Sequence, residues 1–252
     1  MISQLEIEIT FRFLKARKND GFLNIISIFS FIGIALGVAV LIVVMSVMNG
    51  FRTELINKIV GFNAHITVKP YEKKIEIEKL NNQNLNSISK DLILSNSGEG
   101  IIIKGEFTKG IILRGYTGED FPKLDIVKSK NFLGNVNDLL NNNISISKEL
   151  SFMLGVKIGD EITIMSPSGV KTIIGSLPKQ KTFKIISLFE SGLIDFDNNV
   201  AFLNLSTLEE FFNLDLNDRN LEIYLKNPQN IDSQKLIVQR IFDNEFIYSW
   251  SD

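Results

Sequence analysis

Residues 22–48 read FLNIISIFSFIGIALGVAVLIVVMSVM, a stretch of 27 residues without Asp, Glu, Lys or Arg. At about 1.5 Å of rise per residue, a helix of this length measures about 40 Å and exceeds the roughly 30 Å hydrocarbon core of a bilayer. A cleaved signal peptide is the competing interpretation, but its apolar core covers only about 7 to 15 residues before a small-x-small cleavage site. Because the apolar run continues to Met48, the stretch predicts a membrane-spanning helix.

The charges that flank this stretch predict its orientation. Two cations soon follow it, Arg52 and Lys58, and four lie shortly before it: Arg12, Lys15, Arg17 and Lys18. Loops rich in Lys and Arg stay on the cytoplasmic side of a membrane. We therefore expect the N-terminus in the cytoplasm and the main part of the chain in the periplasm.

The segment before the span has its own amphipathic pattern. Leu5, Ile9 and Phe13 lie near one helical face, and Lys15 lies away from it. This spacing predicts a short interfacial helix leading into the membrane, with a frayed tail as the alternative.

Three small residues share one face of the predicted span: Ser30, Gly33 and Gly37. Such a small-xxx-small pattern lets another membrane helix approach closely, so we expect helix packing there. After the span, Phe51, Leu55, Ile59 and Phe62 keep helical spacing, which predicts that the helix continues above the membrane surface.

Beyond Gly61 the pattern changes to short β-type runs separated by polar breaks. The runs are Ile66–Val68, Ile101–Ile103, Ile111–Leu113, Ile162–Ile164, Phe183–Leu188 and Val200–Leu203, and the helical stretches between them are Lys148–Leu154, Thr207–Phe212 and Ser233–Phe242. Asn-rich stretches at 81–86 and 135–143 predict loops. This mixture indicates an α+β fold, with a cytoplasmic segment at 1–21, a transmembrane helix with a periplasmic extension at 22–60 and a periplasmic domain at 61–252.

The residue types present leave little room for catalysis. The chain has no cysteine and one histidine, His65, so a metal centre or a His-based triad lacks its usual members, and we interpret His65 as structural. Asp195 and Asp197 stand beside Asn198–Asn199, where Asp is a routine turn residue. The glycines at 98–100 and 115–118 lack the phosphate-loop arrangement. We expect no catalytic residue, no bound metal and no cofactor.

The net charge and its distribution do not favour nucleic acid as a partner. The formal net charge is -2 and the sequence pI is about 5.6, and Lys and Arg do not gather into one basic stretch. A nucleic-acid-binding surface normally requires such a basic patch.

Several motifs resemble one known family. The stretch around MSVMNGF (45–51) resembles the first membrane helix of the LolC/LolE family, the permease subunits of the lipoprotein-releasing ABC transporter. The resemblance continues through GFNAHI (61–66), GIILRG (110–115), ISKEL (146–150) and LGVKIGDE (154–161). It therefore covers nearly the whole chain and implies a MacB-like mixed α/β periplasmic domain behind the N-terminal transmembrane helix.

The resemblance implies a permease rather than an enzyme. A separate cytoplasmic ABC ATPase would hydrolyse ATP, and acylated lipoproteins would pass from the inner membrane to a periplasmic carrier. Further partners implied are a second permease copy or paralogue and the membrane lipid. In such permeases three more helices follow the periplasmic domain, and the ATPase is contacted through them. We therefore expect residues 1–252 alone neither to recruit the ATPase nor to release lipoproteins.

The family resemblance also implies a lipid-binding surface and a carrier-binding surface. The periplasmic end of the first helix would line the cavity for acyl chains, and four residues occupy that level: Val44, Val47, Met48 and Phe51. Apolar and deformable side chains suit buried methylene groups. The alternative is that these four residues face lipid or pack against a helix.

The second surface is a hook-like loop at residues 167–178, PSGVKTIIGSLP, by which such a permease captures its carrier. Exposed apolar residues between two prolines often mark a binding surface, and proline lowers the entropy lost on docking. The residues expected to contact the carrier are Pro167, Val170, Ile173, Ile174 and Pro178, with Gln180 and Lys181 as a polar pad. A hairpin folded back on the domain is the alternative.

Two other functions compete with lipoprotein release. One is a MacB-like or FtsX-like permease that transmits force for a different substrate or signal. The other is a single-pass periplasmic hydrolase, which is disfavoured because no nucleophile and base pair can be assembled from this sequence.

Overall fold

The computed structural model describes residues 4–14, 21–71, 74–140, 142–172 and 175–252. It divides into two compact units, Met1–Ile56 and Asn57–Asp252. The first unit contains helix α1 (Gln4–Leu14) and most of helix α2 (Gly21–Phe62), an uninterrupted helix of 42 residues. The predicted continuation of the helix beyond Asn49–Gly50 is therefore confirmed.

A ten-stranded sheet forms the centre of the second unit, in the order β10-β1-β9-β2-β3-β8-β5-β7-β4, with β6 pairing with β2 and β7. The strands are β1 (Ile66–Lys69), β2 (Ser89–Lys104), β3 (Phe107–Tyr116), β4 (Leu133–Gly134), β5 (Asn143–Ser147), β6 (Glu161–Thr172), β7 (Gly175–Phe189), β8 (Val200–Asn204), β9 (Asn220–Leu225) and β10 (Phe246–Ser249). Most neighbours are antiparallel, but β3 with β8 and β5 with β7 are parallel.

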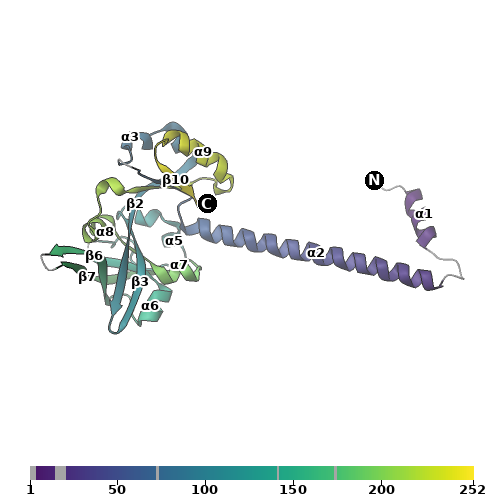
Figure 1. Ribbon diagram of the computed structural model, residues 1–252, viewed down its shortest axis with the longest axis horizontal. Coiled ribbons are helices and arrows are strands. Elements are labelled where there is room, and N and C mark those ends of the chain that lie inside the picture. The colour runs from purple at the N-terminus through teal and green to yellow at the C-terminus, as the bar shows by residue number, and fades with distance from the viewer. Residues whose placement is uncertain (1–3, 15–20, 72–73, 141, 173–174) are drawn as a thin grey trace. The chain divides into compact units, whose positions relative to one another are not determined.

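Strand β2 joins the two parts of this sheet. Its first half, Ser89–Ser95, pairs with β9, and its second half, Asn96–Lys104, pairs with β3. The change of partner at Ser95–Asn96 divides the unit into a smaller part around β1, β9 and β10 and a larger part around β3 to β8. Figure 1 shows the two parts, with α9 and α3 beside the smaller one and α6, α7 and α8 beside the larger one.

Short helices cover the sheet. They are α3 (Ile77–Leu80), α4 (Gln83–Ile88), α5 (Asp125–Lys128), α6 (Lys148–Leu154), α7 (Ile194–Asn199), α8 (Leu205–Phe212) and α9 (Ile231–Ile241), with 3-10 turns at Phe121–Lys123, Leu216–Asp218 and Pro228–Asn230. Helix α8 packs against β2, β3 and β8, and α4 packs against α9. Gly98 permits the α8 contact, because an added Cβ would lie 2.7 Å from the Phe212 ring.

Three apolar clusters stabilise the unit. One lies under the smaller part of the sheet and includes Ile66, Ile223 and Val238. A second lies between α8 and the larger part of the sheet. The third is rich in aromatic residues and includes Phe62, the last residue of α2, whose ring centroid lies 4.2 Å from that of Phe196. Burial of such a side chain contributes about 1.5–3 kcal/mol, so Phe62 anchors the end of α2 in the folded unit.

Most predicted elements are confirmed, and two differ. The six predicted β runs all lie in strands, and the three predicted helices correspond to α6, α8 and α9. The loop predicted at 81–86 is wrong in part, because α4 begins at Gln83, where Asn82 caps the helix and the buried Leu85 anchors it. Asp195 and Asp197 belong to helix α7 instead of a strand and turn.

The sequence patterns did not predict strands β9 and β10. In β9, five consecutive residues from Leu221 to Leu225 are buried, and the charge of Glu222 in their middle hides the apolar run. Strand β10 has only four residues, too few for a clear alternation to emerge.

Candidate functional site

The predicted acyl-chain residues and the predicted helix-packing residues lie on one side of the membrane-spanning helix α2. Among the described residues, Ile25–Glu54 is long and apolar enough to cross a bilayer, and none of it is buried. Val44, Val47, Met48 and Phe51 are each more than half exposed. At about 100° of rotation per residue, these four positions fall on the same side of α2 as Ser30, Gly33 and Gly37.

The two glycines among the three small residues leave open space on that side. A Cβ atom added at Gly33 or Gly37 would meet nothing within 4 Å. The predicted helix-packing surface and the predicted acyl-chain surface are thus two levels of one helical face.

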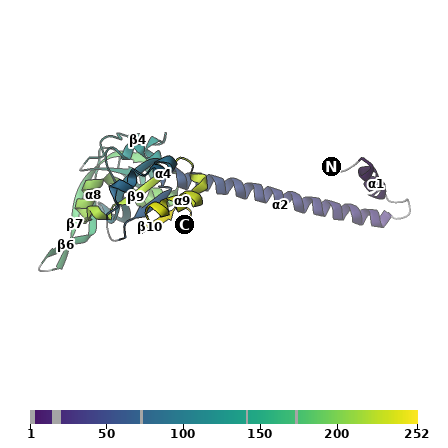
Figure 2. The same cartoon turned by 90° about the horizontal axis from the view of Figure 1, so that it is seen from above.

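The predicted hook is the end of a hairpin formed by β6 and β7. Val170 pairs with Leu177 and Ser166 pairs with Lys179, with an irregularity between them. Pro167 lies in that irregular stretch, as expected for a residue that cannot donate a ladder hydrogen bond. Figures 1 and 2 both show the hairpin extending beyond the rest of its unit.

Apolar residues are exposed near the end of the hairpin. Leu177 is 64% exposed, and Pro167 and Pro178 are also exposed. Ile173 and Ile174, both predicted contact residues, lie outside the described residues, and Val170 is described only by its backbone pairing. The described part of the hairpin therefore projects from its unit and exposes Leu177 between two prolines.

The hairpin is tied to helix α8 at its base. Lys179 donates from Nζ to the carbonyl oxygen of Glu210 at 2.7 Å and to Oδ1 of Asn213 at 3.2 Å. Asn213 has a positive φ of 53° and ends α8. Lys179 thus donates to two groups at the carboxyl end of the helix, where cations are favoured.

The predicted polar pad occupies two faces of the hairpin. Gln180 and Lys181 are consecutive residues of β7, so their side chains project to opposite sides. Gln180 donates from Nε2 to the sulfur of Met165 at 3.6 Å, whereas the Lys181 ammonium lies 5.6 Å from the centre of the Phe183 ring. These two residues cannot form one flat surface without a rearrangement of the strand.

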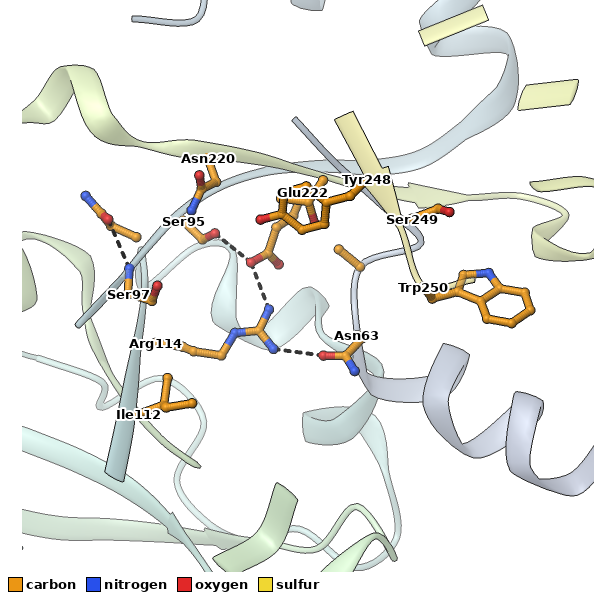
Figure 3. Close-up of a pocket in the computed structure, with 13 residues that line it drawn as sticks. Asn63, Ser95, Ser97, Ile112, Arg114, Asn220, Glu222, Tyr248, Ser249 and Trp250 are labelled. Atoms are coloured by element: carbon orange, nitrogen blue, oxygen red, sulfur yellow. Dashed lines mark hydrogen bonds and ion pairs between the residues drawn. The ribbon is translucent and has the colours of Figure 1, made fainter. Parts of the chain in front are cut away.

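A polar pocket of about 350 Å³ lies between the two parts of the sheet, and sequence reasoning missed it. Its centre is an ion pair between Arg114 of β3 and Glu222 of β9, with Nη2 to Oε1 at 2.9 Å. Arg114 also donates from Nη1 to Oδ1 of Asn63, just after the end of α2, at 3.1 Å. Figure 3 shows Arg114 between Asn63 and Glu222, with Tyr248 and Trp250 nearby.

Hydroxyl groups complete the coordination of Glu222. Its carboxylate accepts hydrogen bonds from Ser95 at 2.6 Å, from Tyr116 at 3.0 and 3.1 Å and from Tyr224 at 3.0 Å. Burial raises the pKa of both Tyr116 and Tyr224 well above the usual value. The two phenols therefore stay protonated and remain donors to Glu222.

Arg114 remains a cation despite its burial. Burial by itself lowers the pKa of Arg114, but the charge of Glu222 and the hydrogen bond to Glu222 raise it, and the pKa lies above its usual value. Removing one partner of such a buried pair typically costs about 3–5 kcal/mol, because the other charge is left uncompensated. The pair therefore holds the two parts of the sheet in one arrangement.

His65 lies where α2 enters the folded unit and is structural. Its Nδ1 accepts from the Leu225 N–H at 2.7 Å, so Nε2 carries the proton and donates to the Val60 carbonyl at 3.2 Å. Burial lowers the pKa of His65, in keeping with a neutral ring. In the described part of the chain, no group of three or more His, Cys, Asp or Glu side chains could hold a metal ion.

Comparison with known proteins gives consistent similarities. The family described as MacB-like periplasmic core domain matches residues 27–239. The lipoprotein-releasing system transmembrane protein LolC of Neisseria meningitidis is 29% identical over 231 residues, which cover 90% of this chain and 55% of that protein. LolC of Xylella fastidiosa is 28% identical over 222 residues, or 85% of this chain and 53% of that protein. The chain spans about half the length of these curated relatives.

Among solved structures, the periplasmic region of MacB from Actinobacillus actinomycetemcomitans aligns with a TM-score of 0.46 and 13% identity, covering 77% of this chain and 92% of that one.

Proposed function

Because the chain belongs to the MacB-like periplasmic core domain family, we propose that it serves as a permease subunit of an ABC transporter that releases lipoproteins from the inner membrane to a periplasmic carrier. The similarity to LolC proteins along 85 to 90% of the chain supports this choice within the family. In this proposal the N-terminus is cytoplasmic, residues 61–252 form the periplasmic domain, and the chain itself catalyses no reaction.

The observation that carries the proposal is the projecting hairpin of β6 and β7. Exposed apolar side chains on a monomer often mark a site for a partner, and Leu177 is exposed between two prolines. The proposed partner is the periplasmic lipoprotein carrier, which must offer an apolar surface to accept acyl chains. The other proposed partners are a cytoplasmic ABC ATPase, a second permease copy or paralogue, the lipoprotein substrates and membrane lipid.

The membrane side of the proposal concerns the exposed face of α2. Val44, Val47, Met48 and Phe51 would contact the acyl chains of the substrate, and another helix on the Ser30, Gly33 and Gly37 level would form the opposing wall. A single helix cannot enclose a lipid chain, so this site requires a second helix.

The test of the carrier contact is the substitution Leu177→Asp in the full chain, with capture of the purified carrier as the measurement. A carboxylate in an apolar contact is costly, so we expect binding to fall at least about tenfold. The control is Leu140→Asp, at a leucine that is 59% exposed and lies outside the hairpin. Exposed substitutions usually change stability by less than about 0.5 kcal/mol, so both variants should unfold like the wild type. Equal capture of the carrier by all three proteins would contradict the proposal.

The continuous helix α2 supports a second candidate function. An uninterrupted helix from Gly21 to Phe62 suits a MacB-like or FtsX-like permease that transmits force for another substrate or signal. Lipoprotein release from membranes of cells that carry the complete transporter separates the two candidates. Release that is unchanged on depletion of this chain would favour the second one.

A further inference from the structure

The outer face of the β2 and β3 hairpin carries a trough that shares Pro167 alone with the proposed contact surfaces. Three cross-strand pairs form its floor: Ile101 with Gly110, Glu99 with Ile112, and Ser97 with Arg114. Residues directly opposite each other in an antiparallel pair share one face of the sheet. The floor therefore changes along the strands from apolar to polar.

The apolar end is a groove of about 500 Å³. Of the described residues that line it, two are polar, Glu99 and Asn199, and the others are Gly100, Ile101, Gly110, Ile111, Ile112 and Pro167. Gly110 forms part of the hollow, since a Cβ atom there would meet nothing within 4 Å. Ile112 is 42% exposed on its floor.

The polar end is the Arg114 pocket described above. Ile112 lines both hollows, so the groove and the pocket adjoin at this residue. The resulting Ile112 trough begins beside Asn63, the residue that follows α2, and ends at Pro167 in the β6 and β7 hairpin.

The polar end still has donors to offer. Arg114 has five N–H groups, of which two form the hydrogen bonds to Asn63 and Glu222. Among the described residues no partner takes the other three, so they stay available to an acceptor at the pocket that Arg114 lines. Glu222 balances the charge of Arg114, so the pocket suits a carbonyl or carboxylate oxygen without requiring a multiply charged group.

An apolar groove joined to a hydrogen-bond-donating pocket matches an amphiphile with one linear tail. We propose that the Ile112 trough binds a fatty acyl chain, with the tail over Ile101, Gly110 and Ile112 and its carbonyl or carboxylate oxygen at Arg114. This inference rests on the proposed function in one respect: the chain would belong to the lipoprotein substrate, held between the end of α2 and the hairpin.

The test uses photolabelling of the full chain in lipid nanodiscs. The probe is palmitic acid with a diazirine in its tail, and labelled peptides are located by mass spectrometry. We expect label within residues 99–112, measured relative to the label on residues 25–54 of the same molecules. Absence of label from residues 99–112 while residues 25–54 are labelled would overturn the proposal.

Two variants and a control make the result specific. Gly110→Leu fills the groove without a clash, and Ile112→Asp places a carboxylate against the tail. Each should reduce the relative label at 99–112 at least about tenfold, because the first variant fills the groove and the second replaces part of its apolar floor with a further carboxylate opposite Glu99. Gly118→Leu adds the same side chain at another glycine with open space around it and should leave the label unchanged. Equal label in all four proteins would also overturn the proposal.

A protein occupant is detected in the same preparation. The chain has no cysteine, so Ile112→Cys introduces a single thiol, and efficient disulfide dimers that palmitic acid does not suppress would place a second copy in the trough instead. Carrier capture is measured in parallel and reports on the hairpin alone. If the wild-type chain is labelled at residues 99–112 but does not capture the carrier, the carrier contact is rejected and the acyl site stands. If it captures the carrier but is not labelled there, the acyl site is rejected and the carrier contact stands.

Discussion

At the scale of single residues, His65 connects segments that are distant in the sequence. Its ring bonds the last turn of α2 through Val60 and strand β9 through Leu225, and its main chain bonds Ile223 and Trp250. A neutral ring with one donor and one acceptor nitrogen satisfies both side-chain contacts. A protonated ring would have two donors, and the Leu225 N–H would lose its acceptor.

This geometry predicts a pH dependence of stability. The pKa of His65 is lowered from 6.5 by burial, so the unfolded chain takes up the proton at a higher pH than the folded chain. The free energy of unfolding should therefore fall as the pH drops below about 6.5 and level off below the folded-state pKa. Denaturant unfolding of the full chain in detergent, followed by the fluorescence of its single Trp250, measures this slope.

The control for this prediction is His65→Leu. Since His65 is the only histidine, the slope between about pH 7.5 and pH 5.5 should flatten in the variant. The variant should also be less stable by about 1–3 kcal/mol at pH 7.5, because the buried Leu225 N–H loses its partner. An unchanged slope would show that groups other than His65 dominate this pH range.

At the scale of elements, α2 combines two requirements on one side. Small residues at 30, 33 and 37 permit close approach of another helix, and larger deformable residues from Val44 to Phe51 lie above them on the same side. If another helix packs against residues 30, 33 and 37, the residues from Val44 to Phe51 would border an opening in which acyl chains fit. The spacing of the helix, not any single residue, sets this arrangement.

The element-scale prediction concerns Gly37. Gly37→Leu should reduce co-purification of a differently tagged second permease chain by about fivefold or more, since interhelical packing of this kind contributes about 1–2 kcal/mol. Ala39→Leu introduces the same side chain about 200° away around the helix and is the matched control. If the two variants behave alike, the small-residue face is not the packing surface.

At the scale of the whole molecule, the chain consists of a membrane-spanning unit and a folded unit that begins at Asn57. Four cations between residues 12 and 18 predict that the N-terminus stays in the cytoplasm. The folded unit would then lie in the periplasm, where a carrier and a substrate acyl chain could reach the hairpin and the trough.

Single-cysteine labelling tests this topology, since the chain has no cysteine of its own. In intact spheroplasts, a membrane-impermeant maleimide should label Ser87→Cys, at an exposed site of the folded unit, and should leave Gln4→Cys unlabelled. Gln4→Cys should react once the membrane is permeabilised. Labelling of Gln4→Cys alone in intact spheroplasts would mean that the orientation is reversed.

The sequence by itself determined the features that arise from local patterns. An uncharged run of 27 residues predicts the span because length and hydropathy alone decide membrane insertion. Short β-type runs predicted six of the strands, and helical stretches between them predicted α6, α8 and α9. The motifs around MSVMNGF and GIILRG identified the family from short stretches, and the prolines at 167 and 178 marked the hairpin.

Only the tertiary structure decided which distant residues meet. Arg114 and Glu222 are separated by 108 positions, and nothing local to either residue predicts that β2 will hold β3 on its second half and β9 on its first. The charge of Glu222 also interrupts the apolar pattern of β9 in the sequence. Its buried carboxylate is stable there because it accepts hydrogen bonds from four side chains: Ser95, Arg114, Tyr116 and Tyr224. The sequence does not reveal the Ile112 trough either, because its floor residues come from two strands, β2 and β3, and its sides come from β6 and α7. Sheet pairing brings these segments together through main-chain hydrogen bonds, which carry no local signature in the side chains, so the sites between strands appear only once the chain is folded.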